Sequence, residues 1–125
     1  MHCIVRSADR MIIDGDAKRI VARSPHGEFA VMDSHAPILA VLVASVVRVL
    51  IGGEEQVIAI KGGTFNMADN HATILVERPY KLEEIDIDDL TKQLATLQTH
   101  ESSTAAMTEE IAYLELLRRV KETHA

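Results

Sequence analysis

The stretch VVRVLIGGEEQVIAIKGG, residues 46–63, decides the fold of this chain. Two runs rich in β-branched residues flank a Gly-Gly-Glu-Glu segment, and glycine tolerates the positive φ angles that a tight hairpin turn requires. The pattern predicts a β-hairpin. The Lys-Gly-Gly that closes it is a further turn signal before the next extended segment.

Short extended segments fill the chain on both sides of this hairpin, up to Glu83. The predicted strands are residues 3–6, 11–14, 17–23, 28–32, 46–51, 56–61, 64–67 and 72–77. Turn signals separate the strands, and no segment of helical length and periodicity lies between them. This spacing is typical of an antiparallel sandwich or barrel and argues against a parallel α/β sheet.

The longest apolar run of the chain lies within this region, at residues 36–47. It falls well short of the ~20 apolar residues that a helix needs to span a bilayer. We therefore interpret the run as buried strands.

The pattern becomes helical after Pro79. The first apolar stripe has spacings of three, four and three residues, which place Ile87, Leu90, Leu94 and Leu97 on one helical face. This predicts a helix over residues 86–99, in which Asp86 accepts a hydrogen bond from a free amide at the helix start. A short break at residues 100–104 precedes a second predicted helix, with a stripe formed by Met107, Ile111, Leu114 and Leu117.

The predicted fold class is therefore α+β, with an N-terminal antiparallel β-sandwich (residues 1–83) and a C-terminal antiparallel two-helix hairpin (residues 84–125). Helices of this length are marginally stable alone, so the hairpin must pack on the sandwich or on another protein.

Composition and charge exclude several classes of protein. The formal net charge of −6 and the lack of a basic patch argue against a nucleic-acid binder. The single cysteine, Cys3, forms no internal disulfide, and the N-terminal residues do not resemble an export signal, so we expect a cytoplasmic setting.

No catalytic or metal-binding motif is present. The six histidines lack the three- or four-residue spacings of known metal motifs. Ser34 and His35 are adjacent, and neighbours on a strand point to opposite faces, so adjacency does not make a nucleophile and base pair. A stand-alone, cupin-like sandwich that binds a small molecule or a metal is the alternative interpretation, but it needs converging histidines that the spacing does not provide.

Several blocks, in the same order, resemble segments of the epsilon subunits of bacterial F-type ATP synthases. GEFAVMDSHAPIL (residues 27–39) is similar to the family block G-E-x-G-V-L-P-G-H-A-P-L-L, and VIAIKGGTF (residues 57–65) is similar to V-I-A-V-S-G-G-F. The strand ATILVE, the helix entry EEID and the closing LLRRV also match. The resemblance covers nearly the whole chain.

The resemblance implies a non-catalytic rotor subunit without a cofactor. In this family the sandwich packs on the rotor shaft (the gamma subunit) and on the ring of membrane ion-carrier subunits. The helical hairpin folds on the sandwich or extends along the shaft, and the extended form blocks ATP hydrolysis. The chain would couple shaft to ring during ATP synthesis, regulate hydrolysis, and lie peripherally at the cytoplasmic face of the cell membrane.

Matching positions assign contact residues on the same basis. The resemblance implies that Glu28, His35, Ala36 and Pro37 contact the shaft and the ring. Arg118 and Arg119 would face acidic segments of the alpha and beta catalytic-head subunits when the hairpin extends.

The chain departs from the family pattern at two informative places. Asp33-Ser34 stands where the family has Pro-Gly, so the turn and its charge differ. In the nucleotide-binding run of some members, I-D-x-x-R-A-x-x-A, the arginine position is Asp89 here, and both alanines are replaced. Because an aspartate repels the phosphates of ATP, we predict no ATP binding by the isolated chain at micromolar concentrations.

Overall fold

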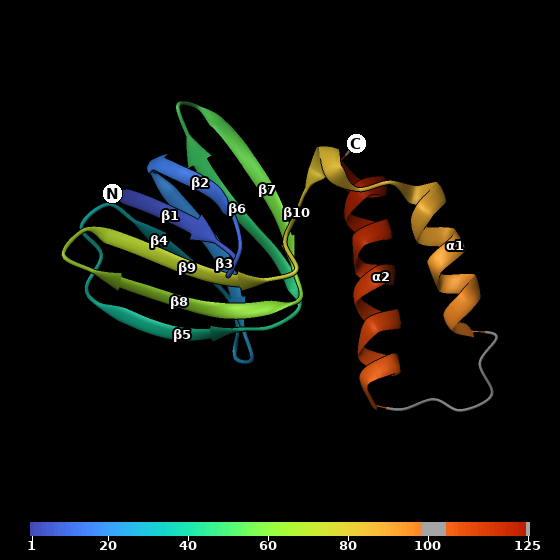
Figure 1. The fold of residues 1–125 in the computed structure, drawn as a ribbon. Helices are drawn as coiled ribbons and strands as arrows, with labels where there is room; N and C mark the ends of the chain where they lie inside the picture. The colour runs from blue at the N-terminus through green and yellow to red at the C-terminus, as the bar shows by residue number, and fades with distance from the viewer. Residues whose placement is uncertain (99–104, 125) are drawn as a thin grey trace. The chain divides into compact units, whose positions relative to one another are not determined.

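The computed structural model describes residues 1–98 and 105–124, and the chain divides into two compact units, Met1–Pro79 and Tyr80–Ala125. The first, the sandwich unit, consists of strands (Figure 1). The second, the helical unit, contains two α-helices. The predicted α+β class is confirmed, although the chain divides after Pro79 instead of after Glu83.

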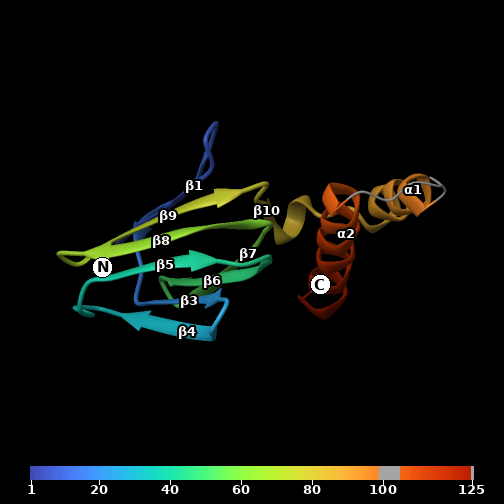
Figure 2. The same cartoon turned by 90° about the horizontal axis from the view of Figure 1, so that it is seen from below.

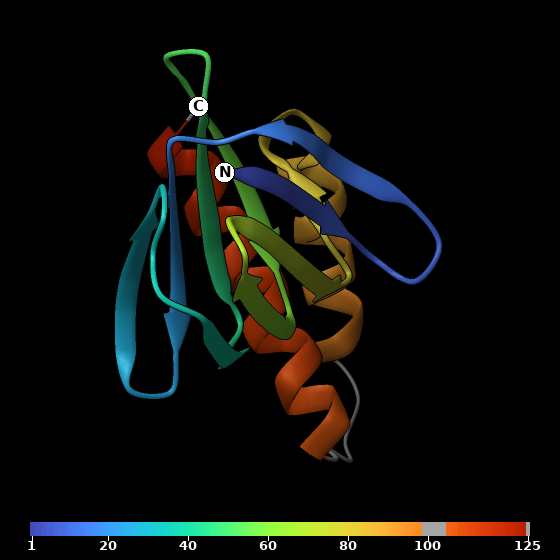
Figure 3. The same cartoon turned by 90° about the vertical axis from the view of Figure 1, so that its left-hand side faces the viewer.

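The first sheet of the sandwich has the strand order β2-β1-β9-β8-β5. Its strands are β1 (His2–Arg6), β2 (Met11–Asp16), β5 (Ile38–Leu42), β8 (Gly62–Ala68) and β9 (His71–Glu77). Figure 2 shows β9, β8 and β5 side by side in this layer. The β1–β2, β5–β8 and β8–β9 pairs are antiparallel as predicted, but β1 and β9 are parallel. This parallel pair forms where the β1–β2 hairpin lies against the β8–β9 hairpin (Figure 3).

Within the sandwich unit the second sheet has the order β7-β6-β3-β4. Its strands are β3 (Arg19–Ser24), β4 (Gly27–Met32), β6 (Ser45–Ile51) and β7 (Glu54–Ile60). The β6–β7 hairpin predicted from residues 46–63 is confirmed, because Ile51 pairs with Glu54 across a two-glycine turn. Gly52 and Gly53 have φ angles of 58° and 81°, in the left-handed region that glycine adopts without steric cost.

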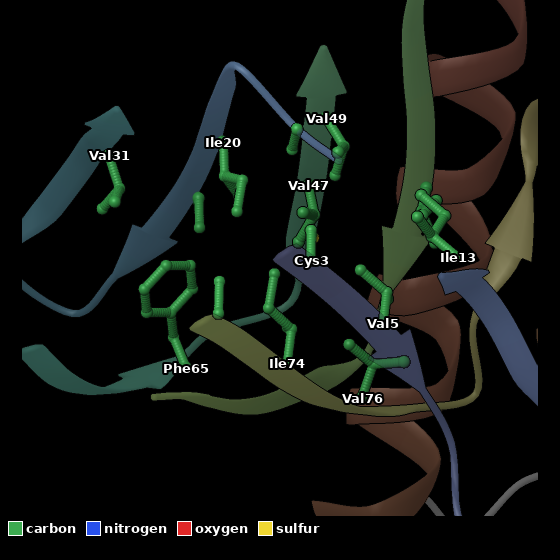
Figure 4. Packing of buried hydrophobic residues seen from close by; sticks show 14 of the residues in the cluster. Cys3, Val5, Ile13, Ile20, Val31, Val47, Val49, Phe65, Ile74 and Val76 are labelled. Carbon is green, nitrogen blue, oxygen red and sulfur yellow. The ribbon is translucent and has the colours of Figure 1, made fainter. Parts of the chain in front are cut away.

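The hydrophobic core lies between the two sheets (Figure 4). Phe65 and Ile74 from the first sheet are fully buried, as are Ile20, Val31 and Val47 from the second. The core is mainly aliphatic, as the composition predicts. The ring of Phe29 packs edge-to-face against that of Phe65, with the ring centroids 5.4 Å apart.

Cys3 on β1 is completely buried in this core, and burial raises the pKa of its thiol to about 12. The reactive species is the thiolate, so we expect no reaction of the folded chain with a thiol-specific disulfide reagent at pH 8. Reaction should be complete once denaturant unfolds the sandwich. Rapid labelling of the folded chain at a rate independent of denaturant would contradict this prediction.

The apolar run at residues 36–47 is only partly buried, contrary to the interpretation from sequence. It contains β5 and the beginning of β6, and Leu39 and Val41 on β5 are 78% and 63% exposed. Leu39 and Val41 are exposed because β5 is at the edge of its sheet and both side chains lie on the outer face, away from the core. An apolar run alone does not distinguish this arrangement from a strand buried on both faces.

The helical unit begins with a short strand, β10 (Tyr80–Lys81), and a 3₁₀ turn, η1 (Leu82–Glu84), followed by α1 (Ile87–Gln98) and α2 (Ala105–His124). The predicted cap is confirmed, because Asp86 Oδ1 accepts hydrogen bonds from the backbone amides of Asp88 (3.0 Å) and Asp89 (3.3 Å). The predicted break at residues 100–104 lies outside the described residues.

The two helices bury a common seam. Its buried side chains are Leu90 and Leu94 from α1, with Tyr113, Leu114, Leu117 and Val120 from α2. The predicted stripe on α2 was incomplete, because Ile111 is only half-buried, whereas Tyr113 and Val120 belong to the seam. The side chains of Leu97 and Met107 lie outside the described residues.

Candidate docking surface

The connection between β4 and β5, residues 33–37, forms an exposed turn that we call the docking turn. It contains His35, Ala36 and Pro37, three of the contact residues predicted from sequence. The backbone N–H of His35 donates to Met32 O at 3.2 Å, and His35 Nδ1 lies 2.6 Å from Ala36 O. Ser34 and His35 therefore lie in a turn, outside the predicted strand 28–32, so the argument that their side chains point to opposite faces of a strand does not apply to them.

Ser34 has a φ angle of 63°, in the left-handed region that a non-glycine residue rarely adopts. Its backbone N–H donates to Asn70 Oδ1 at 2.9 Å. The neighbouring Asp33 carboxylate accepts a hydrogen bond from the amino group of Met1. The Asp33-Ser34 segment therefore makes a turn that needs positive φ, even though it contains no glycine.

Glu28, the fourth predicted residue, lies apart from the docking turn. It is near the beginning of β4, whereas the docking turn follows the end of that strand, roughly 13 Å further along at ~3.3 Å per residue. Glu28 Oε1 lies 3.3 Å from Arg48 Nη2, and its other oxygen lies 3.9 Å from Arg23 Nη2. The structure thus groups three of the four predicted residues and separates Glu28, whose charge is already partnered.

An apolar surface adjoins the docking turn, and reasoning from sequence did not find it. Val41 pairs with Thr64, which pairs with Leu75, so these side chains form one row across β5, β8 and β9. Leu39 lies on the same face of the sheet, two residues before Val41. Leu39, Val41 and Leu75, which is 48% exposed, make up what we call the apolar face.

The apolar face and the docking turn are continuous along the chain, because Pro37 leads directly into β5. Exposed aliphatic side chains grouped on one sheet face are typical of surfaces that bind another protein, which makes this face a candidate docking surface. The detectable signal in the sequence was an apolar edge strand directly after an exposed turn. Finding it required the strand order, which the sequence alone does not provide.

The basic residues of α2 lie in its last turns. Arg119 is exposed and Arg118 is half-buried, whereas Lys121 Nζ donates to Leu82 O at 3.1 Å. Position 89, where some family members have an arginine for nucleotide binding, carries an aspartate whose Oδ2 accepts from Gln93 Nε2 at 2.7 Å. The absence of micromolar ATP binding stays a prediction.

The described residues contain neither a candidate metal site nor a candidate membrane-spanning helix. No cluster of three or more His, Cys, Asp or Glu side chains in residues 1–98 and 105–124 could hold a metal ion. Over the same ranges, no helix is both long enough and apolar enough to cross a membrane.

Comparison with known proteins identifies relatives of this chain by sequence. Residues 1–81 match the family described as ATP synthase, Delta/Epsilon chain, beta-sandwich domain. The ATP synthase epsilon chain of Streptomyces avermitilis is 33% identical over 106 residues, which cover 84% of this chain and 86% of that protein. The epsilon chain of Psychrobacter cryohalolentis is 27% identical, over 97% of this chain and 96% of that protein.

Two solved assemblies contain chains of similar fold. The mitochondrial ATP synthase of Euglena gracilis (OSCP/F1/c-ring, rotational state 1) contains one with a TM-score of 0.77 and 24% identity, over 99% of this chain and 81% of that one. The central stalk and c-ring structure of the Tetrahymena thermophila mitochondrial ATP synthase contains another, with a TM-score of 0.70 and 16% identity, over 96% of this chain and 95% of that one. These matches do not favour the cupin-like alternative. The sequence matches show that the chain belongs to the ATP synthase epsilon chain family.

Proposed function

We propose that this chain is a non-catalytic central-stalk subunit of an F-type ATP synthase, which couples the rotor shaft to the membrane ring and regulates ATP hydrolysis. The observation that carries the proposal is the apolar face beside the docking turn, in a chain of the epsilon family. A subunit of this kind lies at the membrane surface through its partners and needs no membrane-spanning helix.

The apolar face and the docking turn would bind the shaft, the gamma subunit. Leu39 and Val41 expose most of their side chains, and full burial of one such side chain contributes roughly 1.5–3 kcal/mol. The docking turn supplies polar backbone groups and His35 at the edge of this surface, which suits the polar rim of a protein interface. A rigid sandwich held in this way transmits rotation without slipping.

The other sheet offers a polar surface for the ring. Arg48 lies 3.3 Å from Glu28 and 4.0 Å from Glu55, and Arg19 lies 3.5 Å from Glu55. Exposed ion pairs contribute at most about 1 kcal/mol each, so this network adds little to folding. Glu28 would contact the polar loops of the ring as part of this network, and the contact should weaken with salt.

The helical unit would regulate hydrolysis by exchanging between two positions. Its two helices bury one small seam and are marginally stable alone, so a modest difference in free energy between two docked positions can shift the equilibrium. Arg118 and Arg119 would contact acidic segments of the alpha and beta subunits in the extended position. The few basic residues on α2 favour modest inhibition.

Assembly tests the proposal directly. A tagged chain expressed in its native host should co-purify with the gamma subunit and the catalytic head. A chain lacking the tag gives the background. Purification of the folded, tagged chain without either partner would overturn the proposal.

Truncation after Glu84 tests the regulatory role. Removing the helices should leave the sandwich bound to the shaft and raise ATP hydrolysis by the assembled complex, by about twofold for a small free-energy bias of ~0.4 kcal/mol. Hydrolysis is measured on complexes with equal amounts of bound chain. Unchanged hydrolysis would exclude regulation by this unit and leave the coupling role intact.

A further inference from the structure

The docking turn contains an unfavourable backbone conformation that contacts from elsewhere in the chain must stabilise. Ser34 is held at a φ angle of 63°, and an L-residue in this region loses roughly 1–2 kcal/mol relative to its preferred conformations. Such a conformation persists only where surrounding contacts determine it. The turn has no buried side chain to impose it, since residues 33–37 are all exposed.

Asn70 provides the contact that the turn needs. It lies in the turn between β8 and β9, and its side-chain Oδ1 accepts the backbone N–H of Ser34 at 2.9 Å. Figure 1 and Figure 2 both place the β4–β5 connection and the β8–β9 turn at the same end of the sandwich. Asn70 therefore connects two turns that are 36 residues apart in sequence.

The backbone of Asn70 is itself fixed. Its φ angle is 60°, a region that asparagine tolerates better than most residues, and its carbonyl oxygen accepts the His2 N–H at 3.1 Å. The amide side chain thus projects from a position anchored to β1. A freely rotating surface asparagine would contribute little, whereas an anchored one can define the position of its partner.

We infer that Asn70 is a positioning residue for the docking turn. Its side chain holds Ser34 at a positive φ angle, which a glycine would adopt without support. This inference rests on the proposed function, because it assigns the docking turn to the contact with the shaft. With Asn70 in place, His35, Ala36 and Pro37 are presented to the partner in one conformation. Without its acceptor, Ser34 is free to leave the left-handed region, and the turn must be reordered on binding.

Two substitutions separate the side chain of Asn70 from its backbone. Asn70→Gly keeps the positive φ but removes the acceptor, and it should weaken binding to purified gamma subunit by about fivefold, as expected for one lost hydrogen bond. Asn70→Asp keeps an oxygen acceptor at the same place and should bind within about twofold of the unchanged chain. Each affinity is measured by calorimetry.

A second-site change tests the mechanism. Glycine at position 34 adopts positive φ without a supporting contact. The double variant Asn70→Gly with Ser34→Gly should therefore bind within about twofold of Ser34→Gly alone. If Asn70→Gly weakens binding equally in both backgrounds, its effect does not pass through Ser34 and the inference is overturned, as it is if Asn70→Gly binds like the unchanged chain.

A measurement on the isolated chain distinguishes this inference from the proposed function. Amide hydrogen exchange by NMR should be about fivefold faster at Ser34 in Asn70→Gly than in the unchanged chain, with unchanged rates in the core strands. Unchanged exchange at Ser34 would overturn the positioning role whatever the partner. If exchange rises as expected but no variant, nor the unchanged chain, binds the gamma subunit, then the proposed docking function fails and the role of Asn70 in the turn stands.

Discussion

Leu39→Asp should reduce the affinity of the chain for the gamma subunit at least about 100-fold, or ~2.7 kcal/mol. The proposed interface would bury this side chain, so an unpaired carboxylate there must be desolvated or must hold the two surfaces apart. The isolated chain should lose no more than about 1 kcal/mol of unfolding free energy, because Leu39 is 78% exposed. Calorimetric titration of purified gamma subunit measures the first quantity, and denaturant unfolding measures the second.

Leu39→Met is the matched control, because it keeps an apolar side chain of similar volume at the same place on β5. It should bind within about threefold of the unchanged chain. If Leu39→Asp binds as tightly as Leu39→Met while both chains are folded, the apolar face is not the docking surface.

Leu117→Ala should unfold the helical unit and leave the sandwich intact. Leu117 is 1% exposed in the seam between α1 and α2, and truncating a buried leucine costs about 2–5 kcal/mol. The unit has one such seam, and isolated helices of this length are marginal, so that loss exceeds what the seam can sustain. Far-UV circular dichroism should show the loss of helix, with slow amide exchange retained in the β-strands.

Glu122→Ala is the control on the same helix, since Glu122 is exposed and its loss should leave the helical signal unchanged. In the assembled complex, Leu117→Ala should raise ATP hydrolysis as truncation after Glu84 does. Loss of both units in a single transition would show that the sandwich depends on the helices for its stability, contrary to the prediction.

The fold was predictable where local signals agree with the final environment. The β6–β7 hairpin follows from Gly52-Gly53 between two β-branched runs, and the α1 cap follows from Asp86 before an apolar stripe. The parallel pairing of β1 with β9 was not predictable, because it joins two hairpins through contacts remote in sequence. Tyr113 was missed in the seam because the stripe was drawn from aliphatic residues alone.

The candidate surface was predictable only in part. The resemblance led to His35 and Pro37, which lie together in the docking turn, but it assigned no contact to Leu39 or Val41. An apolar side chain on a strand is buried only if it lies on the face that packs against the other sheet, and the sequence does not show which face that is. The contact from Asn70 to Ser34 was also inaccessible from sequence, since neither residue type nor spacing indicates a hydrogen bond between two distant turns.

The parallel pair has a consequence for how this protein is made. β1 precedes the other described strands in the chain, yet it lies between β2 and β9, and β9 ends only at Glu77. Until β9 is available, the β1 edge of the β1–β2 hairpin stays unpaired, and two-stranded hairpins are at best marginally stable. Completion of the first sheet must therefore wait until β9 has left the ribosome. We expect Cys3, a free thiol on β1, to be accessible to oxidants during that interval and to become protected by burial once β9 is in place.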